Sequence, residues 1–190
     1  MIESQVTTEV NVPQVTEVAV NGFTAYTTSA DFCRIFAEQM NSLYLLGFLL
    51  TADVEKAEQC FVAGICDSVE GDAVFKEWAR SWARRTIVQR AIQIAGPAQE
   101  RLTIAYTEPA RLEIEPRLKA ILRLDALERF VFVMSVLEGY SYQDCAILLG
   151  CSRQTVVSAR ARALDHLAKA ARIGVMHGEG PQSTCALVSN

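Results

Sequence analysis

The sequence has no long apolar run and no basic N-terminus. Its longest strongly apolar stretch, Leu43–Leu50, is far shorter than the ~20 residues that a membrane span needs. The first thirty residues hold three glutamates and no lysine or arginine, whereas a secretory signal begins with basic residues and an organellar transit peptide is rich in arginine. We therefore expect a cytoplasmic protein that does not contact a membrane.

Histidine is scarce and the cysteines are scattered. The two histidines are His166 and His177, and none of the six cysteines forms a Cys-x-x-Cys pair, so the spacing of a zinc site is absent. We expect buried, reduced thiols, no metal and no cofactor. The chain also lacks a glycine-rich phosphate loop followed by lysine, and no serine or cysteine is evidently paired with His166. We predict no catalytic residues, and place His166 at the surface or its boundary.

The charge is unevenly distributed along the chain. The net charge of −4 argues against a protein that coats nucleic acid without specificity. The N-terminal acids are Glu3, Glu9 and Glu17, whereas residues 118–172 carry eight basic and five acidic side chains. A local excess of positive charge therefore remains available for DNA near the C-terminus.

Apolar residues at steps of three and four predict an all-α protein with two small helical domains joined by a linker. Hydrophobic residues make up 51% of the chain, enough for buried cores. The expected divisions are an acidic N-terminal tail (1–28), a first helical domain (29–95), a proline-containing linker (96–117), a second helical domain (118–173) and a flexible C-terminal tail (174–190).

Capping residues predict where the helices of the first domain begin. Ser29 or Asp31 is expected to cap the first helix, Asp53 the second and Asp72 the third. The third helix should end before Gly96-Pro97, because this pair is a strong stop signal.

The spacing within residues 141–167 predicts a helix-turn-helix in the second domain. Ala146 is small enough for a second helix to cross closely, and Gly150 tolerates the positive φ that the turn requires. Val156 would face the first helix, and Ser141 and Ser152 would cap the two helices.

The second helix of this motif is expected to bind DNA, because such helices present their N-terminal side chains to the major groove. The predicted DNA-binding residues are Arg153, Gln154, Thr155, Val157, Ser158 and Arg162. The alternative is a helical hairpin without a role in DNA binding.

A second basic surface is expected on the third helix of the first domain. Lys76, Arg80 and Arg84 lie at steps of four, and Arg85 extends the positive charge. Trp78 and Trp82 are also four residues apart. One interpretation is a cationic helix beside single-stranded DNA, with an aromatic ring stacked on an unpaired base. For the tryptophans we favour the other interpretation, in which both belong to the core.

The second domain resembles region 4 of bacterial sigma-70 factors, and within them the extracytoplasmic-function type. Leu124–Arg129 is similar to the family's Leu-Pro-x-x-x-Arg, with Asp125 in place of proline. Leu137–Tyr142 matches the stretch before the family's helix-turn-helix. Asp144–Gly150 resembles Glu-Ile-Ala-x-x-Leu-Gly, and Thr155–Ala163 resembles Thr-Val-Lys-Ser-Arg-x-x-Arg-Ala. The resemblance implies a domain that reads the −35 promoter element.

The first domain resembles region 2 of the same family, in Leu50–Glu58 and in Phe75–Arg84. This resemblance implies binding to core RNA polymerase and to the −10 element of promoter DNA, with polymerase-binding positions at Glu58, Gln59 and Val62. The chain departs from the family at Val62 and Ala63, where a polar Gln-Glu pair is usual. It also has Val157 and Ala159 where cations are frequent.

These departures leave three functions open. The first is a sigma factor that directs core RNA polymerase to promoters. The second is a helix-turn-helix regulator without polymerase binding, and the third is an interaction module that binds an anti-sigma partner.

Overall fold

The computed structural model describes residues 25–97 and 115–176, and within them the secondary structure is helical. The single β feature of this part is an isolated antiparallel bridge between Tyr26 and Phe75. The all-α fold is therefore confirmed. Most of the N-terminal tail, of the C-terminal tail and of the predicted linker lies outside the described residues, so the domain limits stay predictions.

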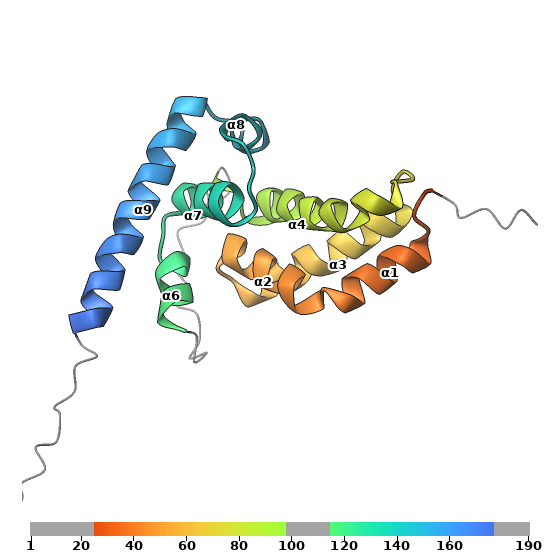
Figure 1. Ribbon diagram of the computed structural model, residues 1–190, viewed down its shortest axis with the longest axis horizontal. Coiled ribbons are helices and arrows are strands. Elements are labelled where there is room, and N and C mark those ends of the chain that lie inside the picture. The colour runs from red at the N-terminus through yellow and green to blue at the C-terminus, as the bar shows by residue number, and fades with distance from the viewer. Residues whose placement is uncertain (1–24, 98–114, 177–190) are drawn as a thin grey trace, which may run out of the picture.

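The first group of helices is a four-helix bundle (Figure 1). It consists of α1 (Ser29–Glu38), α2 (Met40–Thr51), α3 (Val54–Glu70) and α4 (Ala79–Ala95), with a 3-10 turn η1 (Lys76–Trp78) before α4. Its core includes Phe36, Leu43, Leu50 and Ile87, which are at most 1% exposed. Gly64 lets α3 approach α4, since a Cβ built there would lie 2.8 Å from Ile87 Cδ1.

The second group is α6 (Pro116–Leu122), α7 (Ala126–Phe132), a π-helical turn η2 (Val133–Leu137), α8 (Tyr142–Leu149) and α9 (Arg153–Met176). The long helix α9 extends past the predicted end of the domain at residue 173 and lies at the far end from α1 (Figure 1). Phe130, Val156 and Ala163 are fully buried where α7, α8 and α9 meet.

The two groups pack against each other through α2 and α7 and share one continuous apolar core. Buried Arg129 of α7 donates from Nε to the backbone carbonyl of Leu50 at 3.0 Å and from Nη1 to that of Leu124 at 3.0 Å. Because a buried carbonyl needs a donor, this side chain ties the end of α2 to the second group.

Several predicted helix limits hold and others are wrong. Asp53 caps α3 by accepting from Lys56 N, and α4 ends at Ala95, as expected. The cap of α1 is Thr28, with Asp31 completing a capping box. The first predicted helix breaks at Gln39 into α1 and α2.

The cap predicted at Asp72 is also wrong, because the chain there pairs with the segment before α1. Thr27 N donates to Val74 O at 2.7 Å, and Lys76 N donates to Ala25 O at 2.8 Å. This pairing holds the chain extended, so that α4 begins only at Ala79.

Candidate nucleic-acid interface

The helix-turn-helix forms as its local sequence predicts. Ser141 accepts from Asp144 N and caps α8, and Ser152 accepts from Thr155 N at 3.1 Å and so caps α9. Gly150 ends α8 at φ 62°, in the left-handed region that favours glycine. Ala146 and Val156 are buried between the two helices. The start of α9 is therefore held in a defined direction by two caps and a close crossing.

The predicted DNA-binding residues of α9 gather at its N-terminal end. Arg153 and Gln154 are exposed, Val157 is 39% exposed and Ser158 is half-buried. Thr155 is half-buried and its hydroxyl is 2.8 Å from that of Ser152, so it also belongs to the cap. The first two turns of α9 thus present four kinds of side chain that can contact base edges: a guanidinium, an amide, a hydroxyl and an apolar group.

Arg162 lies two turns further along α9 and is paired with an acid. Its Nε donates to Oε1 of Glu128 at 2.7 Å, and Nδ1 of His166 lies 2.9 Å from Oε2 of the same carboxylate. Arg162 remains 55% exposed and His166 51% exposed, whereas Glu128 is 2% exposed. The surface position of His166 is as predicted, but the sequence did not reveal the buried carboxylate that it contacts.

Arg160 connects the two helices of the motif through Tyr142. It donates from Nη1 to the Tyr142 hydroxyl, and its guanidinium carbon lies 5.5 Å from the centroid of that ring. This contact joins the first residue of α8 to the second turn of α9, and no sequence pattern indicated it.

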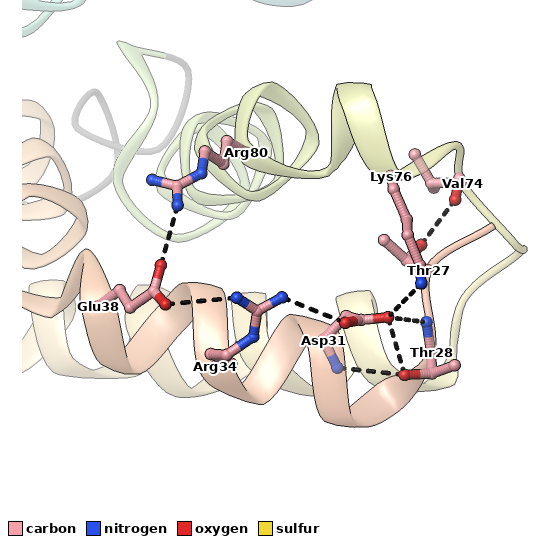
Figure 2. A network of polar contacts seen from close by, with 8 residues as sticks. All are labelled: Thr27, Thr28, Asp31, Arg34, Glu38, Val74, Lys76 and Arg80. Carbon is pink, nitrogen blue, oxygen red and sulfur yellow. Dashed lines mark hydrogen bonds and ion pairs between the residues drawn. The ribbon is translucent and has the colours of Figure 1, made fainter. Parts of the chain in front are cut away.

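On the first group, the predicted basic stripe is largely paired with acids of α1 (Figure 2). Arg80 donates to Glu38 at 2.9 Å, and Lys76 Nζ lies 3.8 Å from Asp31. Arg34 bridges Asp31 and Glu38, at 3.3 and 3.5 Å. Hydrogen bonds from Thr28 keep the pKa of Asp31 below its usual value, so this carboxylate stays ionised. These pairs are exposed, and exposed pairs are weak enough for a polyanion to compete for the cations.

The other two predicted cations differ in their surroundings. Arg84 donates from Nε to Glu138 at 2.7 Å and from Nη2 to the other carboxylate oxygen. This hydrogen bonding raises the pKa of Arg84 above its usual value. Arg85 is exposed and makes no ion pair within the described part of the chain.

The tryptophans line an open groove and are not in the core, which corrects the interpretation that we favoured. Trp78 is 56% and Trp82 38% exposed. The groove has a volume of about 1050 Å³ and lies between the two groups of helices, with Phe75, Arg85 and Tyr140 also in its walls. Trp78 ends the 3-10 turn η1 and Trp82 lies in the first turn of α4, and both rings are exposed there.

The positions predicted to bind polymerase lie together on the outer face of α3. Glu58 and Gln59 are exposed, and Val62, one turn later, is 60% exposed. This surface combines an acid, an amide and an apolar side chain.

Among the described residues, no three His, Cys, Asp or Glu side chains come together as a metal site. The thiol prediction is partly wrong: Cys60 and Cys145 are buried, but Cys33 and Cys66 are exposed. No helix in residues 25–97 or 115–176 is long and apolar enough to span a membrane.

Comparison with known proteins identifies the second group of helices. Residues 118–167 match the family described as Sigma-70, region 4. No curated protein matches the chain. One similar solved structure is that of the sigma factor RpoE in complex with the anti-sigma factor NepR from Bartonella quintana. It is 19% identical, with a TM-score of 0.46, over 75% of this chain and 98% of that one.

The helix-turn-helix part of the chain is therefore a sigma-70 region 4 domain, as its motifs predicted. The family match begins at residue 118. The resemblance of residues 29–95 to region 2 stays a prediction.

Proposed function

We propose that this chain is a sigma factor that directs core RNA polymerase to specific promoters. The observation that carries the proposal is the capped helix-turn-helix within residues that match sigma-70 region 4. In this proposal the start of α9 enters the major groove of the −35 element. Arg153, Gln154 and Ser158 contact base edges there, with Val157 available to a thymine methyl group.

The groove lined by the tryptophans suits the −10 element. Trp78 and Trp82 offer exposed rings on which unpaired bases stack, and Arg85 lies beside them as an exposed cation. Lys76, Arg80 and Arg84 would add to the positive surface after exchanging their acidic partners for phosphates. Each exchange replaces one ion pair by another. The cation therefore contributes less to the free energy of DNA binding than an unpaired side chain would.

Reading both elements requires the two groups of helices to separate. The centres of the −10 and −35 elements are about 25 base pairs apart, or about 85 Å at 3.4 Å per base pair. In the structure, α2 and α7 are in contact and Arg84 is bonded to Glu138. The 17 residues between 97 and 115 can reach about 60 Å when extended, so the chain permits a large separation. The packed arrangement therefore suits the free protein rather than the promoter-bound one.

A regulator without polymerase binding is the second candidate. Its support is the surface at Val62 and Ala63, which lacks the family's polar pair, and the acids that neutralise Lys76 and Arg80. Partner binding has its own support in an exposed apolar row on α9 formed by Val157, Ala161, Leu164 and Ala168, which an anti-sigma partner could cover.

The test is co-purification of the tagged full chain with core polymerase, followed by run-off transcription from a promoter library. The proposal expects a stable complex that starts at a defined set of promoters. Gln154→Ala should change which promoters are used, since a lost base contact costs ~1–3 kcal/mol at one position. Arg172→Ala is the matched control, because Arg172 is exposed on the same helix but five turns from its start. DNA binding without a polymerase complex would favour the regulator, and a chain that binds neither would favour the interaction module.

A further inference from the structure

Glu128 is the most deeply buried acidic side chain among the described residues. It lies on α7, away from the face of α9 that we propose reads DNA. Its carboxylate accepts a hydrogen bond from Arg162 Nε and lies 2.9 Å from Nδ1 of His166, one turn further along α9. Burying a carboxylate is costly unless it is paired. A leucine at this position would join the core at no such cost, so packing alone does not account for the acid.

The geometry of Arg162 indicates what the acid does. On a helix of 3.6 residues per turn, Arg162 lies on the flank between the buried face of Val156, Ala159 and Ala163 and the outward face of Gln154 and Ala161. A side chain on this flank, beyond the first two turns, is placed for the phosphate backbone beside the groove rather than for base edges.

The guanidinium of Arg162 is bonded through one of its three nitrogens. Its Nε is bonded to Glu128, and within the described part of the chain the guanidinium makes no second hydrogen bond. Its two terminal nitrogens therefore remain available, and a phosphate is a ligand that they can bind as a pair. The side chain is 55% exposed, so a phosphate can reach it.

We propose that Glu128 is a positioning residue for DNA binding: it fixes Arg162 through Nε so that Nη1 and Nη2 face a backbone phosphate beside the −35 element. This inference rests on the proposed DNA-binding function of α9. Fixing the side chain in advance removes the entropy cost of ordering a long, flexible arginine when DNA binds. A lysine replaces it poorly, because an ammonium group lacks the planar pair of donors that binds a phosphate in bidentate fashion.

A double-mutant cycle on DNA affinity tests the proposal, using the full chain and a fluorescein-labelled duplex of mixed sequence. A phosphate contact does not depend on sequence, so the promoter need not be known. Arg162→Ala should weaken binding and reduce the dependence of log K on log salt by about one phosphate contact between 50 and 200 mM salt. Glu128→Gln should weaken binding about three- to tenfold in the wild-type background and less than twofold in the Arg162→Ala background.

A merely structural role for Glu128 would weaken binding by the same factor in both backgrounds, and that result would overturn the proposal. His166→Ala is the matched control, because it removes the other partner of the carboxylate and leaves Arg162 in place; it should change affinity less than twofold. Thermal unfolding identifies any variant that fails to fold. Arg162→Lys changes an exposed residue, so it should fold normally. It should bind DNA more weakly than the wild type, because it keeps the charge but loses the paired donors of the guanidinium. If the wild-type chain does not bind DNA, the proposed function and this inference are both overturned. If the chain binds DNA but Glu128→Gln weakens binding equally in the wild-type and Arg162→Ala backgrounds, the inference alone is overturned.

Discussion

Arg84 of α4 donates two hydrogen bonds to Glu138, which follows the π-helical turn η2 of the region 4 domain. The carboxylate is 8% exposed and the guanidinium 36% exposed. The pair is therefore better shielded from salt than the exposed pairs of α1, and it connects one of the predicted DNA-binding cations to the other group of helices. In the packed arrangement this contact occupies Arg84, which can bind DNA only after it exchanges Glu138 for a phosphate.

If the two groups of helices separate as the proposed function requires, removing this pair should favour the separation. Glu138→Gln keeps the size of the side chain but removes the charge, and charged hydrogen bonds contribute about 1.5–3 kcal/mol each. We expect a larger radius of gyration in small-angle X-ray scattering. We also expect up to tenfold tighter binding to promoter DNA, because Arg84 is released.

The pair between Arg90 and Asp67 provides a control for this experiment. It is also bidentate, its side chains are each 34% exposed, and it joins α3 to α4 within one bundle. Asp67→Asn should lower the thermal stability and leave the radius of gyration and the DNA affinity unchanged. If Glu138→Gln behaves in the same way, the Arg84–Glu138 pair does not hold the domains together.

The turn of the helix-turn-helix depends on the backbone of Gly150. A Cβ built there would meet no atom within 4 Å, so the cost of a side chain comes from its φ of 62° alone. Gly150→Ala should lower the free energy of unfolding by ~1–2 kcal/mol, and Gly150→Asn by less, since asparagine tolerates this region better. Chemical denaturation measures both values.

Ala52 gives the reciprocal test. It ends α2 at φ 54° and is the one residue other than glycine with a positive φ in the described part of the chain. Ala52→Gly should raise the free energy of unfolding by up to ~1 kcal/mol, less the entropy that glycine adds to the unfolded chain. If Ala52→Gly lowers the stability instead, that entropy outweighs the backbone strain at this position.

Local patterns in the sequence were sufficient to predict the helix-turn-helix. The caps at Ser141 and Ser152, the turn at Gly150 and the buried Val156 all depend on residues within a few positions of each other. The match of residues 118–167 to region 4 was also predictable, because its motifs are short and contiguous in the sequence.

Features that depend on distant residues were not predictable in this way. Asp72 has the right chemistry for a helix cap, but the pairing of Val74 with Thr27, 47 residues earlier, keeps that segment extended. The exposure of Trp78 follows from this late start of α4. The acidic partners of Arg80 and Arg84 lie 42 and 54 residues away, so a stripe that reads as free positive charge is largely paired in the fold.

The cysteines should differ sharply in reactivity. Burial raises the pKa of both Cys60 and Cys145 to about 11, whereas Cys33 and Cys66 are exposed. Because the thiolate is the reactive form, iodoacetamide at pH 8 should modify Cys33 and Cys66 first and leave Cys60 and Cys145 unmodified in the folded chain. Peptide mass spectrometry measures this order, and early modification of Cys145 would contradict its burial in the helix-turn-helix.

The same raised pKa values predict how stability changes with pH. A thiol whose pKa is raised by folding contributes to the stability of the folded chain. This contribution is fully present below the unfolded pKa of about 9 and is lost as the pH rises to the folded pKa of about 11. The midpoint of urea unfolding should therefore fall between pH 9 and 11. Cys60→Ala combined with Cys145→Ala should make this fall smaller.

Trp78 and Trp82 are the two tryptophans of the chain, and both line the groove between the two groups of helices, so intrinsic fluorescence reports on it directly. Single-stranded DNA that stacks on these rings should quench their emission, and Trp78→Ala should weaken its binding by ~1–3 kcal/mol. The stability of this variant should change little, because Trp78 is 56% exposed. Ile147→Ala is the matched control, because it also truncates an exposed apolar side chain. Ile147 is 67% exposed on α8 and does not line the groove, so its loss should leave the binding of single-stranded DNA unchanged. Equal single-strand affinity in wild type and Trp78→Ala would exclude this ring from DNA binding and leave Arg85 and Trp82 as the groove's remaining candidates.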